Sequence, residues 1–199
     1  MDLFSQSGAE MLPYDGSARL FEDVWTNDES RLIEAELIES LGWKQLTVEV
    51  FNRKVDQPRL TCWYGDEGRS YSYSGVSLSA KPWSPLLHEI RGECEALSGV
   101  QFNSVLANLY RTGSDSISWH SDNEPELGVH PVIASVTFGA TRRFDMRHRK
   151  TKEVVHINLT SGSILLMSGA SQEKWQHQIA KTKKPIAPRI NLTFRTIYV

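Results

Sequence analysis

Apolar residues recur at helical spacing in the first half of the chain and at strand spacing in the second half. The stretch "NDESRLIEAELIESLGW" has apolar residues three and four positions apart, Asn and Asp near its start that can cap it, and Gly42 near its end. This pattern predicts a helix over about 28–41. A second helix is expected over about 85–97, because Ser84 can cap it and Pro85 suits the first helical position.

The second half of the chain consists of short segments rich in β-branched and aromatic residues, separated by Gly, Asn or charged turns. Each segment has the length of a strand. Two helices followed by seven or more strands predict an α+β protein with a jelly-roll core, in which the helices pack on one sheet. The expected strands lie at 105–111, 117–122, 131–139, 141–148, 153–159, 162–169 and 190–199.

The composition is that of an ordinary globular domain. The chain has 199 residues, of which 40% are hydrophobic and 23% are charged. Residues 1–18 lack periodicity, so we expect a flexible N-terminal tail before a single domain over 19–199. No apolar run approaches the ~20 residues of a membrane span, and the N-terminus has no signal-peptide pattern. We expect a monomer without membrane contact, cytoplasmic in a bacterium, with the nucleus as the alternative in a eukaryote.

Charge is distributed unevenly along the chain. The formal net charge is -2, but residues 1–30 carry seven acidic residues and one Arg, which leaves 21 basic and 17 acidic residues in 31–199. The segment "RRFDMRHRKTK", residues 142–152, has six Lys or Arg and one Asp. Such a cluster can neutralise phosphate groups, although a solvated basic hairpin has the same composition.

The stretch "SISWHSDNEP" places a histidine and a carboxylate on one face of a predicted strand. His120 and Asp122 are two positions apart, so both side chains would point into the barrel. Two histidines and one carboxylate on one face are the ligands of non-haem Fe(II) oxygenases. His177, which follows the apolar "SILLMSG" strand, is the best candidate for the third ligand. The pattern is weak alone, and the other histidines remain alternatives: His88, His130, His148 and His156.

The last predicted strand, "PRINLTFRTIYV", separates polar from apolar side chains with period two. Two arginines on the face that would line the barrel need a partner, because an unpaired buried charge costs several kcal/mol. They could bracket a small dicarboxylate near the metal. In "NLY", Asn108 and Tyr110 share one strand face and can assist. The polar face of the last strand comprises Arg189, Asn191, Thr193 and Arg195.

These motifs, which occur in order between about residues 45 and 199, resemble the AlkB-type Fe(II)- and 2-oxoglutarate-dependent dioxygenases. The resemblance is closest to the branch that includes the animal nuclear DNA-repair homologues. It implies a double-stranded β-helix fold and O2 as the second co-substrate. The iron ligands that it implies are His120, Asp122 and His177. The 2-oxoglutarate ligands that it implies are Asn108, Tyr110, Arg189, Thr193 and Arg195, with Asn191 nearby.

The resemblance also implies direct-reversal repair of alkylated DNA, with RNA as a further substrate. The bases would be 1-methyladenine and 3-methylcytosine, and the products formaldehyde, succinate and CO2. A lid over about 48–78 would cover a flipped base, and Phe51 would fill the gap left in the duplex. The residues expected to bind the substrate nucleotide are Arg59, Tyr71, Tyr73, Ser74 and Glu124. Those expected at the DNA backbone are Arg59, Arg142, Arg143, Arg147, Arg149 and Lys150.

Three other classes of protein compete with this interpretation. A 2-oxoglutarate oxygenase that acts on proteins or small molecules would share every iron and co-substrate residue. A catalytically silent nucleic-acid-binding module would be expected to have a broken metal triad, whereas this triad is intact. A zinc hydrolase could use the same ligands but gives no reason for the paired arginines. Cys62 and Cys94 lack CxxC spacing, which indicates neither a disulfide framework nor a thiolate zinc site.

Overall fold

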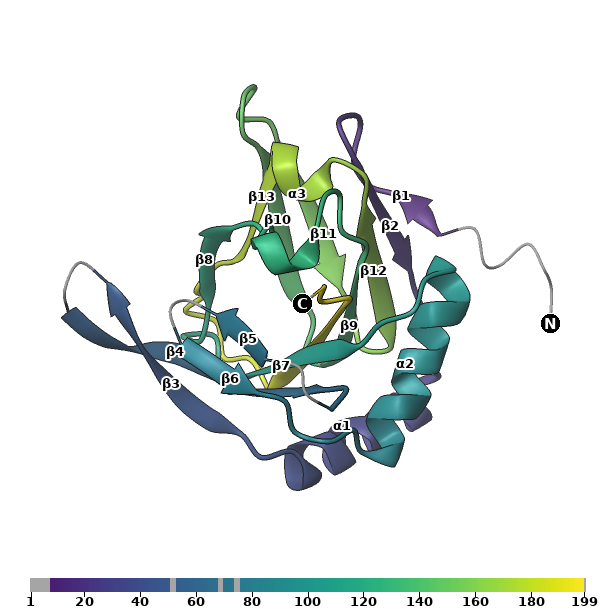
Figure 1. Ribbon diagram of the computed structural model, residues 1–199, viewed down its shortest axis with the longest axis vertical. Helices are drawn as coiled ribbons and strands as arrows, with labels where there is room; N and C mark the ends of the chain where they lie inside the picture. The colour runs from purple at the N-terminus through teal and green to yellow at the C-terminus, as the bar shows by residue number, and fades with distance from the viewer. Residues whose placement is uncertain (1–7, 51–52, 68–69, 74–75, 199) are drawn as a thin grey trace.

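The computed structural model describes residues 8–50, 53–67, 70–73 and 76–198; for 48–50, 53, 70–73 and 76–79 it describes the backbone alone. Two antiparallel sheets face each other as a jelly roll (Figure 1), which confirms the predicted fold class. The major sheet comprises, in spatial order, β1 (Ala9–Glu10), β2 (Ser17–Phe21), β12 (Ser163–Ser168), β9 (Ile133–Gly139), β14 (Arg189–Arg195), β7 (Ser104–Tyr110), β4 (Arg53–Gly65) and β3 (Lys44–Val50).

The minor sheet supplies the opposite wall of the barrel. Its spatial order is β11 (Val154–Leu159), β10 (Arg142–His148), β13 (Trp175–Ile179) and β8 (Ile117–His120). A separate hairpin pairs β5 (Ser70–Tyr73) with β6 (Val76–Ser79). The predicted strands after the second helix are all found, but β13, which carries His177, was not predicted. Buried and half-buried residues alternate over only five positions after the short helix α3 (Ser171–Lys174), and the middle three residues are all polar.

Two longer helices cover the outer face of the major sheet (Figure 1). Helix α1 (Asn27–Ser40) begins with a capping box, in which the Glu29 N–H donates to Thr26 Oγ1 and the Thr26 N–H donates to the Glu29 carboxylate. The cap is therefore Thr26, and the expectation of an Asn or Asp cap was wrong. Helix α2 (Pro85–Ser98) is capped by Ser84, as predicted. No helix in the described part of the chain is long and apolar enough to cross a membrane.

The apolar core has two main parts, one on each side of the major sheet. Outside the barrel, fully buried residues of β14 such as Leu192 and Phe194 pack with residues of both helices, including Leu37 and Ile90. Inside the barrel, a second cluster fills the space between the two sheets and includes Trp175. Strand β14 therefore separates the helix layer from the barrel interior, and its other face is free to carry polar groups.

Residues 9–18 are part of the barrel and not of a flexible tail, so the expected tail is wrong over this range. Strand β2 extends the major sheet along β12, and β1 pairs with β2. The Trp175 Nε1–H donates to the carbonyl oxygens of Tyr14 and Asp15, and Leu12 is buried. The contacts with β12 and Trp175 are long-range, which explains why the local sequence gave no sign of them. Residues 1–7 lie outside the described residues.

Part of the expected lid belongs to the barrel wall. Residues 58–65 belong to β4, and residues 60–65 pair with β7 in the major sheet. Trp63 is 3% exposed and Tyr64 is 7% exposed, so both belong to the core. The aromatic residues of this segment therefore contribute to the barrel wall. The hairpin β5–β6 lies within the expected lid, but its side chains are not described.

Candidate metal and co-substrate site

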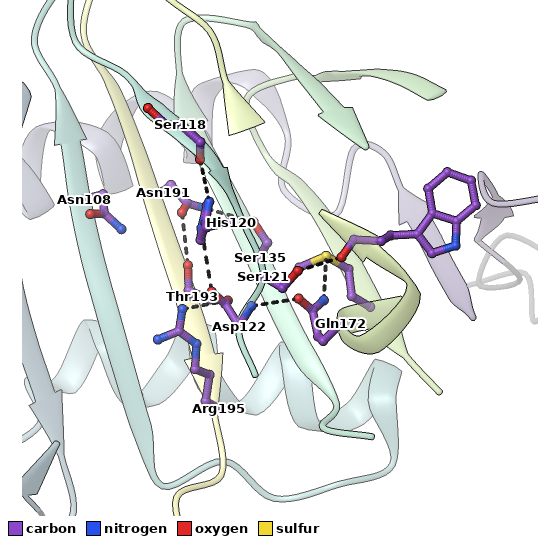
Figure 2. Close-up of polar contacts among 12 residues, drawn as sticks. Asn108, Ser118, His120, Ser121, Asp122, Ser135, Gln172, Asn191, Thr193 and Arg195 are labelled. Carbon is purple, nitrogen blue, oxygen red and sulfur yellow. Dashed lines mark hydrogen bonds and ion pairs between the residues drawn. The ribbon is translucent and has the colours of Figure 1, made fainter. Parts of the chain in front are cut away.

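Strands β8 and β13 are neighbours in the minor sheet and bring two histidines together. His120 pairs with His177, and the centroids of their imidazole rings are 4.2 Å apart. Asp122 follows the end of β8, and its carboxylate lies close to the His120 ring (Figure 2). Potential ligand atoms from these three side chains all lie within 4.8 Å of one another. The structure therefore brings together the three residues that the sequence pattern grouped.

Hydrogen bonds fix two of these side chains in orientations suited to a metal. His120 Nδ1 is 2.8 Å from the carbonyl oxygen of Ser118. A carbonyl oxygen only accepts, so the ring proton lies on Nδ1 and the lone pair of Nε2 is available to a metal ion. Asp122 is held twice (Figure 2): its Oδ2 accepts from Arg195 Nη2 at 2.7 Å, and its N–H donates to Gln172 Oε1 at 3.0 Å. His120 Nε2 is 3.7 Å from the other oxygen, Asp122 Oδ1.

The donor set fits a divalent metal ion. Asp122 Oδ1 and His177 Nδ1 are buried and have no hydrogen-bond partner among the described residues. Burial alone would raise the pKa of Asp122, but Arg195 and, less strongly, the two histidines hold it well below its usual range. Burial, followed by the nearby His120, lowers the pKa of His177 to about 3. At neutral pH, Asp122 is therefore ionised and His177 neutral, the forms that bind metals.

The other histidines do not join this cluster. His148 and His156 are each paired with an aspartate elsewhere, and His88 and His130 are exposed. In the part of the chain that the structure describes, no second group of His, Cys, Asp or Glu side chains has metal-ligand spacing.

The polar face of β14 lines a cavity between the two sheets, as its period-two pattern predicts. Ile190, Leu192 and Phe194 pack on the helix side, while the alternate residues face the cavity. Asn108 and Tyr110 of β7 line the same cavity, next to β14 in the sheet. The residues of β14 that line it are Arg189, Asn191, Thr193 and Arg195.

The two arginines of β14 have different partners. Arg195 donates to Asp122, whereas Arg189 donates through Nη2 to Thr137 Oγ1 at 2.9 Å and lies over the Tyr110 ring. Arg189 is 1% exposed, and its Nε and Nη1 have no hydrogen-bond partner among the described residues. Burial lowers its pKa to about 10, so it still carries its charge at neutral pH. Arg189 is therefore placed to bind an anion, while Arg195 is already bound to a carboxylate.

The middle of the polar face is bonded within the barrel wall (Figure 2). Asn191 Nδ2 donates to Ser135 Oγ at 2.8 Å and to the Val136 carbonyl, and Thr193 Oγ1 donates to Asn191 Oδ1 at 3.0 Å. These contacts use the amide of Asn191 and the hydroxyl proton of Thr193. Thr193 keeps lone pairs that face the cavity, whereas Asn191 mainly supports the wall.

Arg59 and Arg142 are buried in the barrel wall, which does not support their predicted contacts with the DNA backbone. Arg59 is 3% exposed and donates to Asn108. Arg142 is 4% exposed and donates to the carbonyl oxygens of three residues in neighbouring loops. Both lie on inward-facing positions of strands, which a local charge count cannot distinguish from outward-facing ones.

The other residues of the basic cluster remain accessible. Arg143 pairs with Asp145, and Arg147 lies over the Trp119 ring at 4.3 Å. Arg149 and Lys150 are exposed in the turn between β10 and β11. Arg149 Nη2 donates to Ser121 Oγ, which places this turn beside the chain that links His120 to Asp122.

The expected base contacts are only partly described. Glu124 begins the 3-10 helix η1 (Pro125–Leu127), and its buried Oε2 has no hydrogen-bond partner among the described residues. Phe51 and Ser74 lie outside the described residues. For Tyr71 and Tyr73 the structure gives only the backbone of β5.

Three residues of the site were not predicted. Gln172 accepts from Asp122, Phe144 stacks on His177 with ring centroids 5.1 Å apart, and Ser135 accepts from Asn191. The alternation in "ASVTF" and "RRFDM" could have placed Ser135 and Phe144 on inward faces. Nothing in the local sequence distinguishes Gln172 from an exposed glutamine.

The fold and the site together define a class of protein, and comparison with known families agrees. Residues 17–195 match the 2OG-Fe(II) oxygenase superfamily, and the chain belongs to this family. Fe(II), 2-oxoglutarate and O2 are thus the cofactors that the family implies, and the donor set above fits the metal.

Within the family, the curated relatives are of the AlkB type. The chain is 43% identical over 180 residues to human alpha-ketoglutarate-dependent dioxygenase alkB homolog 3, covering 85% of this chain and 62% of that protein. It is 42% identical over 158 residues to bovine DNA oxidative demethylase ALKBH2, covering 75% and 57%. The chain thus spans about three fifths of the length of these relatives. The solved structure of OsALKBH1 shares the fold, with a TM-score of 0.67 at 16% identity, over 94% of this chain and 100% of that one.

Proposed function

We propose that this protein is an Fe(II)- and 2-oxoglutarate-dependent dioxygenase that removes methyl groups from 1-methyladenine and 3-methylcytosine in DNA, and in RNA as a second substrate. The observation that carries the proposal is one cavity with metal donors at one end and the buried Arg189 at the other. The names of the relatives, among them DNA oxidative demethylases, support the choice of substrate.

The roles of the residues follow from their surroundings. His120, Asp122 and His177 would hold the iron, which with 2-oxoglutarate and O2 supplies the oxidation of the methyl group. Arg189 would bind the distal carboxylate of 2-oxoglutarate through the nitrogens that lack a partner among the described residues. Asn108, Tyr110 and Thr193 line the space between, and Asn191 supports it. Arg195 would keep Asp122 ionised and oriented.

The proposed substrate contacts surround the open end of the site. Glu124 Oε2, buried without a partner among the described residues, could accept from the exocyclic amine of a methylated base. Arg149 and Lys150 would contact phosphates, since their turn lies beside the chain that leads to Asp122. The roles of Phe51 as a wedge in the duplex and of Tyr71, Tyr73 and Ser74 as lid contacts rest on the resemblance alone.

Incubation with methylated oligonucleotides tests the proposal. Single- and double-stranded DNA and RNA carrying one 1-methyladenine or 3-methylcytosine would be incubated with the protein, Fe(II), 2-oxoglutarate and O2, then weighed by mass spectrometry. We expect loss of 14 Da per lesion, with formaldehyde and succinate in equal amounts. Turnover of 2-oxoglutarate without loss of mass from any of these oligonucleotides would favour a protein or small-molecule substrate instead.

A further inference from the structure

Asn108 faces the cavity from β7 and accepts hydrogen bonds from side chains of β4, the neighbouring strand. Arg59 and Thr61 lie on β4, and Thr61 is the register partner of Asn108. Arg59 Nε donates to Asn108 Oδ1 at 2.8 Å, and Thr61 Oγ1 donates to the same oxygen at 3.3 Å. Arg59 Nη1 also donates to the carbonyl oxygen of Ser116, just before β8, at 3.3 Å.

These contacts determine which end of the Asn108 amide faces Arg59. A guanidinium can only donate hydrogen bonds, so the atom that it meets must be the amide oxygen and not the nitrogen. Asn108 is 4% exposed and lines the cavity on the same side as Asn191, its register partner on β14 (Figure 2). With its oxygen held by Arg59 and Thr61, the amide offers its N–H donors to the cavity.

We propose that Arg59 is a positioning residue for the co-substrate: it locks the Asn108 amide so that the N–H groups, rather than the oxygen, face a carboxylate in the cavity. The inference rests on the proposed binding of 2-oxoglutarate in this cavity. An unlocked amide could turn its oxygen towards that carboxylate, where two acceptors would repel each other. Arg59 thereby acts through Asn108, because a side chain that is 3% exposed has little surface to offer a base.

Co-substrate binding without turnover tests this role. Binding of 2-oxoglutarate to the Mn(II)-loaded protein would be measured by calorimetry in the absence of oligonucleotide, for the wild type, Arg59→Met and Thr61→Val. We expect Arg59→Met to weaken binding about tenfold or more, since hydrogen bonds to charged groups contribute at this level. Thr61→Val should have a smaller effect, because Arg59 still holds the oxygen. Arg91→Met is the matched control, since Arg91, on α2, donates to the Phe102 carbonyl oxygen and does not line the cavity.

A second variant tests the amide orientation even if Arg59→Met does not fold. Asn108→Asp keeps an oxygen towards Arg59 and places a second oxygen towards the cavity. We expect it to lose 2-oxoglutarate binding while its melting temperature is unchanged or higher, because Arg59 gains a charged partner. A clear drop in melting temperature would mean that Arg59 does not hold this side chain and would overturn the proposal.

The outcomes separate this inference from the proposed function. Unchanged 2-oxoglutarate affinity in folded Arg59→Met, while Arg189→Met loses affinity, would refute the role of Arg59 alone. A raised KM for the oligonucleotide with unchanged 2-oxoglutarate binding would return Arg59 to substrate contact. Failure of the wild type to bind 2-oxoglutarate would instead remove the proposed function.

Discussion

The two ends of the polar face of β14 carry the same residue type in opposite situations. Arg195, at the metal end, is 4% exposed and donates to Asp122 at 2.7 Å. Arg189, at the other end, is 1% exposed and contacts the Thr137 hydroxyl and the Tyr110 ring. One arginine is bound within the protein, and the other retains donors that the described residues do not use.

The two guanidiniums, predicted to bracket one dicarboxylate, therefore differ in the partners that hold them in the ligand-free protein. A buried ion pair is intact only while both partners are present, so Arg195 and Asp122 stabilise each other. A buried cation without a carboxylate costs free energy until a ligand arrives, so Arg189 keeps its binding capacity at the expense of stability. Substitutions at the two ends should therefore have opposite effects on the metal-free, ligand-free protein.

The largest effect is expected at the carboxylate that joins the metal end to Arg195. Asp122→Ala should abolish iron-dependent turnover, because it removes a proposed ligand. It should also lower the free energy of unfolding by about 3 to 5 kcal/mol, since Arg195 loses the carboxylate to which it donates. Formaldehyde release and urea unfolding measure the two effects.

Asp145→Ala is the matched control for Asp122→Ala. Asp145 is another buried aspartate with charged partners, but it pairs with His156 and Arg143 and does not line the cavity. Its loss should lower stability while leaving turnover per folded molecule intact. Normal turnover by folded Asp122→Ala would contradict the metal assignment.

Arg195→Met should destabilise the protein by a similar ~3 to 5 kcal/mol, because the buried Asp122 carboxylate loses its guanidinium. The pKa of Asp122, now without its main counter-charge, should rise, so that Mn(II) binding weakens as the pH is lowered. Urea unfolding and Mn(II) titration at two pH values check this. An unchanged unfolding midpoint would show that the ion pair contributes little.

Arg189→Met should weaken 2-oxoglutarate binding by roughly ten- to a hundredfold, the contribution of a charge-assisted pair. In contrast to Arg195→Met, it should leave the ligand-free melting temperature unchanged or raise it. The pKa of Arg189 is lowered to about 10 in the folded protein, so below that pH the folded state contains a desolvated charge that the variant removes. Calorimetry and thermal unfolding test the pair of effects, and a large fall in melting temperature would remove the contrast.

The smallest effect is expected at Gln172, which holds Asp122 through the Asp122 backbone N–H. Gln172→Met removes the acceptor of the Asp122 N–H, a neutral hydrogen bond that contributes about 1 kcal/mol. Looser positioning of the carboxylate should also weaken Mn(II) binding by roughly tenfold. Gln176→Met on β13 serves as the control, because Gln176 does not line the cavity and accepts from Arg147. Equal effects of the two substitutions would assign Gln172 to packing alone.

The sequence by itself determined those features that depend on local periodicity. Period two in 188–199 assigned Arg189 and Arg195 to one face of β14 and Leu192 to the other, because alternate side chains of a strand point in opposite directions. The same rule placed His120 beside Asp122. Helix boundaries followed from Ser84, Pro85 and the apolar spacing. The family resemblance supplied the residue roles that periodicity could not assign.

The tertiary structure alone decided which charged side chains are partners and which remain available. Arg59 and Arg142 are as basic in sequence as Arg149, but strand pairing turns the first two inward and leaves the third in an exposed turn. Arg195 meets Asp122 across a sequence separation of 73 residues, and residues 9–18 join the barrel through Trp175. Contacts between distant segments leave no local pattern, because they depend on how the two sheets close over one cavity.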